Sequence, residues 1–147
     1  MSKTATNNKN SLYESDYCLW LDTTLQQLKN NDFKNLDIAN LIEEIESLGR
    51  KERAELLNRL IVLFEHLLKL EYWKQELERN KRGWKNTVIE QTNQIEILLE
   101  DSPSLKPSLD AIVERAYARA LKVTKKKTGL DNLPENNPFD VRDIIEW

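Results

Sequence analysis

The 147-residue sequence contains few helix-breaking residues and few of the side chains that build common catalytic sites: three Gly, four Pro, one Cys and one His. With so little glycine, we expect no Gly-rich phosphate-binding loop. The lone Cys18 excludes an internal disulfide. Di-iron helical bundles need two Glu-x-x-His motifs, so the single His66 excludes that type of site. No apolar run approaches the roughly 18 residues that a membrane-spanning helix needs, and we expect no membrane association.

What the sequence does contain is typical of a helical protein. Hydrophobic residues make up 39% and charged residues 32%, with abundant Leu, Glu, Lys and Asn. These residues, with few breakers and little β-branched clustering, predict an all-α fold. The 22 basic and 25 acidic residues nearly balance, at a formal net charge of −3. A dedicated nucleic-acid-binding protein is usually basic, so this balance argues against that class.

The length fits one domain. Residues 1–10 are polar and contain no apolar segment typical of a secretory signal, so we expect a disordered tail and a cytoplasmic location. Residues 11–147 are predicted to form a single helical domain. We expect four to five main helices in a bundle, closed by a short C-terminal helix, and no cofactor.

The stretch from residue 54 to residue 71 is the most apolar helical pattern in the chain. Placed at about 100° per residue, its apolar side chains fill roughly 200° of arc, more than one packed face requires. They are Ala54, Leu56, Leu57, Leu60, Ile61, Leu63, Phe64, Leu67, Leu68 and Leu70. A helix over about residues 51–73 should therefore be central and contact neighbours on several sides.

Two shorter helices are predicted before it. Ser11 and Glu14 have the capping-box spacing, which indicates a first helix ending near Asn30 and Asn31. Asp37 is expected to cap a second helix that stops at Gly49. The second helix has a clear apolar stripe: Ile38, Leu41, Ile42, Ile45 and Leu48. Phe33 and Leu36 are expected to fold onto the core, and Cys18 to be a small packing residue.

After the central helix, residues 74–83 are polar and are predicted to be a connector. A fourth helix should follow from Trp84, with Gln91 inside its apolar stripe and therefore in need of hydrogen-bond partners. Pro107 is predicted to start a fifth helix that ends at Gly129. Asp140 should cap a last short helix, which extends to Trp147.

The pattern resembles a bacterial family, the domain of unknown function DUF29, from about residue 12 to residue 147. The resemblance rests on these residues: Tyr-Glu-Ser-Asp-Tyr-Cys-Leu-Trp at 13–20, Leu36-Asp37, Glu-Glu-Ile-Glu-Ser-Leu-Gly at 43–49, His-Leu-Leu-Lys at 66–69, Trp84, Pro-Ser-Leu at 103–105, Tyr117 and Pro138. It implies an all-helical protein. Asp140 replaces a hydroxyl residue more usual in the family, but both types cap helices. The family implies no activity, substrate or cofactor.

The first candidate site combines carboxylates of the second helix with the single histidine, in a polar cluster of Glu43, Glu44, Glu46, His66 and Lys69. Acids on a helix flank with basic neighbours usually form ordinary surface pairs, which is the interpretation we favour. The alternative is an enzyme or a mononuclear metal site built from one of these acids and the histidine.

A second candidate is a basic-aromatic patch formed by Trp73, Lys74, Arg79, Lys81, Arg82 and Trp84. Rings interleaved with cations can stack bases and hold phosphates, so a weak nucleic-acid binder is a further alternative. Intervening glutamates dilute the positive charge, and we do not expect binding at physiological salt.

Apolar residues outside the main stripes are the third signal. Ile89, Ile97, Leu121 and Val62 are either buried by several neighbouring helices, which we expect for Val62, or form part of a partner surface. The absence of a strong catalytic pattern and these leftover apolar residues favour a non-catalytic interaction or regulatory module. We expect its partner to be another protein or a second copy of the chain.

Overall fold

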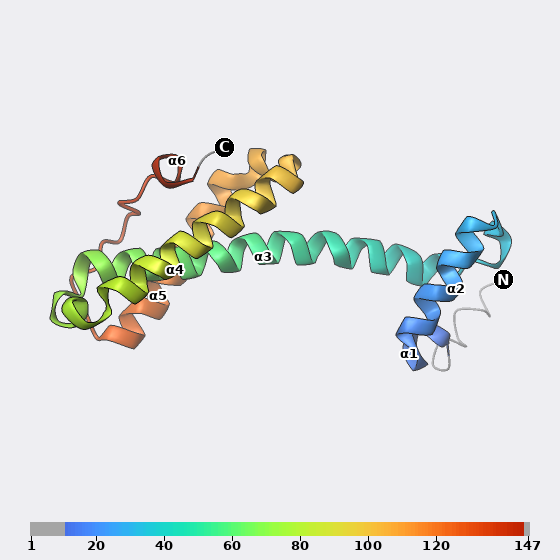
Figure 1. The fold of residues 1–147 in the computed structure, drawn as a ribbon, viewed down its shortest axis with the longest axis horizontal. Helices are drawn as coiled ribbons and strands as arrows, with labels where there is room; N and C mark the ends of the chain where they lie inside the picture. The colour runs from blue at the N-terminus through green and yellow to red at the C-terminus, as the bar shows by residue number, and fades with distance from the viewer. Residues whose placement is uncertain (1–10, 146–147) are drawn as a thin grey trace. The chain divides into compact units, whose positions relative to one another are not determined.

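The computed structural model describes residues 11–145, which contain helices and no β-strand. The all-α fold predicted from composition is confirmed (Figure 1). Its elements are α1 (Leu12–Ser15), α2 (Tyr17–Lys29), η2 (Phe33–Asn35), α3 (Ile38–Tyr72), α4 (Lys74–Asp101), η3 (Pro103–Ser108), α5 (Leu109–Thr128) and α6 (Val141–Ile144). None of the described helices is long and apolar enough to cross a membrane. The predicted tail at 1–10 and Trp147 lie outside the described residues.

Residue contacts divide the chain into two compact units, residues 1–50 and residues 51–147. Helix α3 passes through the boundary, so its first part belongs to the first unit and its remainder to the second. The expectation that residues 11–147 fold as a single domain stays a prediction.

The predicted first helix is interrupted at Asp16. The backbone there leaves the helical region (φ −150°, ψ 88°), which separates α1 from α2. The Asp16 carboxylate then caps α2 by accepting a hydrogen bond from the Leu19 amide at 3.1 Å, whereas the Ser11 hydroxyl caps nothing. At the other end of α2, Asn31 adopts the left-handed conformation expected there (φ 56°). Asparagine tolerates this conformation better than most residues.

The predicted stop at Gly49 is wrong, because α3 continues through it to Tyr72. A glycine inside a helix costs about 1 kcal/mol relative to alanine. The flanking Arg, Lys and Glu residues are good helix formers, and no break in the hydrophobic pattern forces the chain to turn. As predicted, Asp37 caps the helix, accepting from the Asn40 amide at 3.4 Å.

Two predictions of burial in the first unit are also wrong. Phe33 is 59% exposed, and Cys18 is an exposed free thiol. Leu36 is half-buried. The first unit is too small to cover all of its apolar residues, and its buried side chains include Trp20 and Thr24 on α2.

The second unit contains the large hydrophobic core, and α3 is central to it as predicted. Five side chains on α3 are fully buried, namely Leu56, Leu60, Leu63, Phe64 and Leu68. They join Ile95 and Leu99 of α4, and Leu109, Ala116 and Ala120 of α5, in one cluster. The two alanines are four residues apart and fully buried, which allows the close helix contact that small side chains permit.

Residues 74–83 are helical, so the predicted connector is wrong. Helix α4 begins at Lys74, and the chain turns at the single residue Trp73 (φ −94°, ψ 68°). Most residues in this segment are Lys, Arg, Glu, Gln or Leu, which form helices well. Their polarity indicates solvent exposure, not a loop.

The C-terminal part follows the sequence prediction except at its last helix, which was predicted to include Ile145: α6 ends at Ile144, and Ile145 has extended backbone (φ −113°, ψ 129°). Pro103 and Pro107 lie in η3, and α5 begins just after them at Leu109. Gly129 ends α5 in the left-handed conformation (φ 72°), which glycine adopts at little cost. Asp140 caps α6, accepting from the Arg142 amide at 3.0 Å.

Candidate functional site

A buried carboxylate in the first unit binds two tyrosines. Glu44 is 9% exposed, and its Oε2 accepts a hydrogen bond from the Tyr13 hydroxyl at 2.9 Å. The Tyr17 hydroxyl donates to Oε1 of the same carboxylate. These contacts connect α1 and α2 to α3, and we call the three residues the acid–tyrosine cluster.

Trp20 packs against both tyrosines of the acid–tyrosine cluster. Its ring meets Tyr13 edge-on at a centroid distance of 4.7 Å and stacks on Tyr17 at 6.2 Å. The indole Nε1 donates to Asp37 at 3.2 Å, which joins α2 to the start of α3 a second time. The same aspartate therefore caps α3 and anchors α2.

The acid–tyrosine cluster keeps both phenols protonated. The hydrogen bond to Glu44, followed by burial, raises the pKa of Tyr17 to about 12 and also raises the pKa of Tyr13. A phenol whose hydrogen bond stabilises its neutral form is a donor at neutral pH and a poor general base or nucleophile. The cluster is thus suited to holding helices together.

The acid–tyrosine cluster was not predicted, although a signal for it exists. Tyr13, Tyr17 and Trp20 follow one another at four- and three-residue spacing, which places them near one another on helical backbone. The pairing with Glu44 joins residues 27 and 31 positions apart. A pattern read along one helix contains no information about such contacts.

The acidic members of the predicted polar cluster lie in the first unit, and His66 and Lys69 lie in the second. Glu43 forms the expected surface pair with Arg50, at 3.2 Å between Oε1 and Nη2. Glu46 is exposed. Within residues 11–145, no three His, Cys, Asp or Glu side chains form a group that could hold a metal ion. A site shared by Glu44 or Glu46 with His66 stays an untested alternative to ordinary surface pairing.

His66 and Lys69 have local partners within the second unit. His66 Nδ1 lies 2.8 Å from the carbonyl of Val62, which can only accept, so the ring donates from Nδ1. Buried Glu65 accepts from Lys127 Nζ at 2.5 Å, and Lys69 Nζ lies 4.0 Å from the same oxygen. Burial lowers the pKa of Lys69, and the nearby Lys127 lowers it further, while Glu65 opposes both effects.

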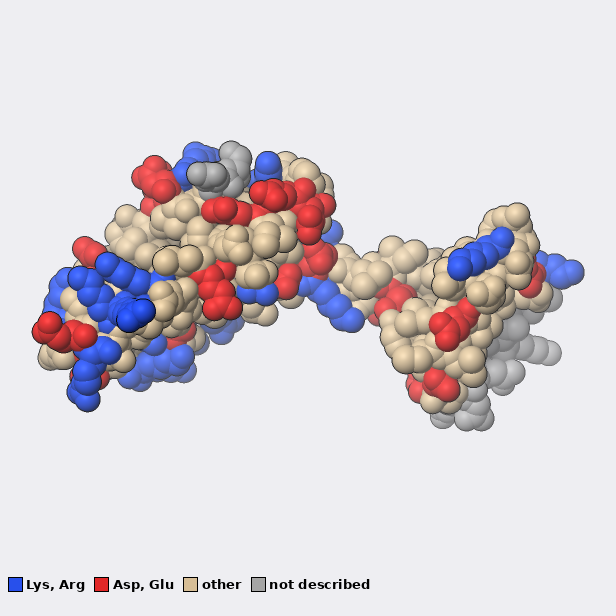
Figure 2. Space-filling model, viewed as in Figure 1, with Lys and Arg blue, Asp and Glu red and all other residues tan. Residues whose placement is uncertain are grey.

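The structure brings the two tryptophans of the basic-aromatic patch together. The Trp73 and Trp84 rings stack at 5.7 Å with an interplanar angle of 13°, and Lys69 Nζ lies 6.0 Å from the Trp84 ring. The basic members are exposed: Lys74, Arg79, Lys81 and Arg82. In Figure 2, blue side chains gather over this end of the second unit, where α3 meets α4.

The stacked tryptophans point to a structural role for these rings. Both rings are half-buried, and one face of each is covered by the other ring. This leaves less ring surface for stacking on a base. Arg79 also pairs with Glu76 at 3.5 Å. The Trp73–Trp84 stack closes the one-residue turn between α3 and α4.

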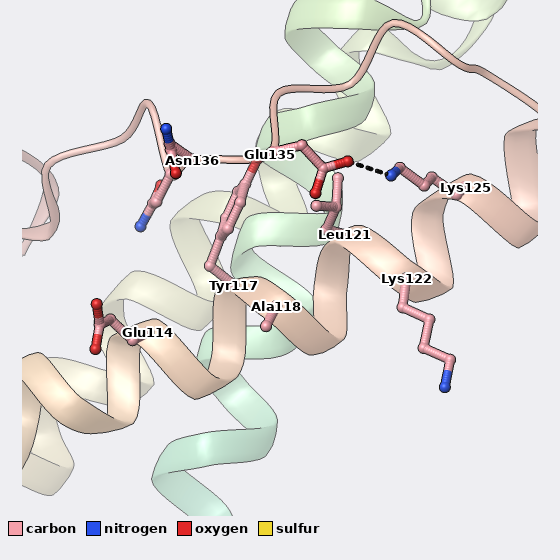
Figure 3. A pocket seen from close by; sticks show the side chains of 9 residues that line it. Glu114, Tyr117, Ala118, Leu121, Lys122, Lys125, Glu135 and Asn136 are labelled. Carbon is pink, nitrogen blue, oxygen red and sulfur yellow. Dashed lines mark hydrogen bonds and ion pairs between the residues drawn. The ribbon is translucent and has the colours of Figure 1, made fainter.

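A hollow of about 460 Å³ lies between α5 and the loop that follows it (Figure 3). The Tyr117 hydroxyl donates to the carbonyl of Pro134 at 2.5 Å, and burial raises the pKa of Tyr117 to about 12. Lys125 and Glu135 pair across the rim at 2.8 Å. These polar groups satisfy one another, so they fix the loop on α5.

The apolar signal has a different distribution from the one predicted. Val62 is half-buried, as expected, and Leu121 is buried. Ile89 and Ile97 are exposed, at 66% and 41%. However, ten of the twelve large hydrophobic side chains exposed within residues 11–145 belong to the first unit.

These first-unit residues follow helical stripes. On α2, Tyr17, Leu21, Leu25 and Leu28 recur every three or four residues, and on α3 Ile38, Ile42, Ile45 and Leu48 do the same. Ile42, Ile45 and Leu48 are 53%, 60% and 54% exposed. The predicted stripe on α3 is therefore real, but described residues do not cover it.

Comparison of the chain with curated proteins and with solved structures found no significant match. A family model does match, over residues 12–147, and its description is "Domain of unknown function DUF29". This match covers nearly the whole chain and includes every helix described above. The resemblance seen in the sequence is confirmed, and the chain belongs to the DUF29 family.

Proposed function

We propose that this chain is a non-catalytic interaction module that binds another protein through the exposed stripes of α2 and the start of α3. The observation that carries this proposal is the concentration of exposed large apolar side chains in the first unit. Monomeric proteins scatter such residues singly, whereas apolar residues gathered at helical spacing mark sites of helix-mediated association.

The acid–tyrosine cluster supports this function by fixing α2 against α3. Both apolar stripes then belong to helices whose mutual position is set by Glu44 and by the Trp20–Asp37 hydrogen bond. A surface held in place before binding loses less conformational freedom when a partner docks.

Affinity purification after cross-linking in the native cell tests the proposal. Two variants with equal numbers of substitutions are compared with the wild type: Ile42→Asp with Ile45→Asp in the first unit, and Ile89→Asp with Ile97→Asp in the second. All four isoleucines are exposed, so neither pair should disturb the fold. We expect a specific partner to be lost with the first pair and retained with the second.

The reverse result would contradict the proposal. Retention of the same partner by Ile42→Asp with Ile45→Asp, in a variant whose circular dichroism matches the wild type, would show that the first-unit stripes do not bind it.

A further inference from the structure

The charges around the apolar stripes indicate which kind of partner they fit. Residues 11–50 contain eight acidic side chains and only three basic ones. The acidic residues are Glu14, Asp16, Asp22, Asp32, Asp37, Glu43, Glu44 and Glu46, and the basic residues are Lys29, Lys34 and Arg50. The whole first unit, residues 1–50, adds Lys3 and Lys9, so the apolar stripes belong to a unit with eight acidic and five basic side chains.

Two of these acids lie directly beside the stripes. Glu46 follows Ile42 by four residues on α3, and Asp22 lies three residues from both Leu19 and Leu25 on α2. Residues three or four apart are neighbours on a helix surface. Both carboxylates are exposed, and within residues 11–145 neither has a hydrogen-bond or ion-pair partner. They are free to pair with cations of a docked molecule.

We propose that the α2 and α3 stripes dock a basic amphipathic helix, with apolar residues on one face and Lys or Arg at its edges. This inference rests on the proposed function and specifies the partner's chemistry. A helix fits because its ridges match side chains spaced three and four residues apart. A second copy fits less well, since two units with an excess of three acidic side chains each would repel each other.

The test uses the full chain and three labelled synthetic peptides, each about five helical turns long. One has a Leu face with Lys elsewhere, the second has the same Leu face with Glu elsewhere, and the third has the Leu/Lys composition in a scrambled, non-amphipathic order. Binding is measured by fluorescence anisotropy at low and high salt. We expect only the amphipathic Lys peptide to bind, with an affinity that falls as salt screens the charges.

Variants separate the apolar contribution from the charge contribution. Ile42→Asp with Ile45→Asp should weaken binding of the Lys peptide by more than about tenfold, because buried anchors dominate interface affinity. Asp22→Asn with Glu46→Gln should weaken it by a few-fold and reduce its salt dependence. The matched control Glu43→Gln removes an acid already paired with Arg50, and we expect little change.

The outcomes distinguish the two proposals. If the Lys and Glu peptides bind equally, and both are lost with Ile42→Asp and Ile45→Asp, the basic partner is wrong and the interaction function stands. If the isoleucine substitutions leave binding of the Lys peptide unchanged, the stripes are not the docking site and both proposals fail. A dimer in sedimentation that dissociates with Ile42→Asp and Ile45→Asp would replace the basic helix with a second copy.

Discussion

At the scale of single residues, identical side chains have different roles according to the face of the helix on which they lie. Glu44 and Glu43 are adjacent on α3, yet Glu44 is buried against two tyrosines while Glu43 pairs with Arg50 in solvent. The helix geometry accounts for this difference, since consecutive residues point about 100° apart. Adjacent positions can therefore serve as paired test and control.

Glu44→Gln should lower the pKa of Tyr13 and Tyr17. The raised folded-state pKa means that the cluster stabilises the fold fully below the ordinary tyrosine value of 10.0, and that this contribution is lost as pH rises toward about 12. The substitution weakens the main cause, the hydrogen bonds that the two phenols donate to the carboxylate, because the amide of glutamine has one acceptor oxygen and no charge. Tyrosinate absorbance followed with rising pH checks this: two tyrosines should titrate earlier in the variant. Tyr117, whose pKa is raised mainly by burial and further by its second-unit neighbours Tyr72 and Glu135, should not move. Glu43→Gln should leave the titration curve unchanged.

Leu60→Ala and Leu48→Ala are the same substitution on one helix, with different expected costs. Leu60 is fully buried, so its truncation should lower the free energy of unfolding by about 2–5 kcal/mol. Leu48 is 54% exposed, so its truncation should change that free energy by less than about 0.5 kcal/mol. Urea unfolding of both variants measures this difference. Equal losses would mean that the α3 stripe is covered within the protein.

At the scale of elements, the structure replaces two predicted breaks with continuous helix. Gly49 and the polar segment 74–83 both lie inside helices, whereas Gly129 ends one. Glycine is a stop only where the backbone must turn left-handed, and the described positive-φ glycine is Gly129. Gly49 and Gly83 lie in helix interiors without competing turn residues, where glycine is tolerated.

Two alanine substitutions test this distinction. An added Cβ at Gly83 or at Gly129 meets no atom within 4 Å, so space does not separate the two sites. Gly83→Ala should stabilise the protein by roughly 0.5–1 kcal/mol, because alanine forms helix better. Gly129→Ala should destabilise it by about 1 kcal/mol, because φ is 72° there. Thermal unfolding measures both, and a destabilising Gly83→Ala would contradict a helix through residues 74–83.

Elements with strong local signals could be predicted from the sequence. The apolar density around Leu60, the prolines before α5, and the Asp140 cap each depend on residues close in sequence. Contacts between distant residues could not be predicted, which is why the acid–tyrosine cluster was missed. The stripe of α3 was recognised, but periodicity shows only that one face is apolar. Whether another element of the same chain covers that face depends on tertiary packing.

At the scale of the whole molecule, the two units differ in how much core they possess. The large hydrophobic cluster draws all its buried members from residues 56–145, in the second unit. The first unit contributes about 40 described residues and buries few large side chains, among them Trp20. Chains below about 40 residues rarely hold a fold without additional support.

Fragments should therefore behave differently. Residues 51–147 expressed alone should remain helical and unfold cooperatively, because the large core is intact. Residues 1–50 alone should show little helix by circular dichroism, since short isolated helices are marginal in water. A fully helical 1–50 fragment with a cooperative transition would show that the first unit is an independent domain.

Site-specific photo-cross-linking in living cells tests the central claim most directly, with a photoreactive amino acid placed at Ile45 or, in the matched control, at Ile97. Both side chains are exposed, at 60% and 41%, and each lies on a long helix of its unit. We predict a discrete adduct with one other protein from position 45, abolished by Ile42→Asp, and no such adduct from position 97. An adduct from position 97 alone, or one from position 45 that persists with Ile42→Asp, would contradict docking through the first-unit stripes.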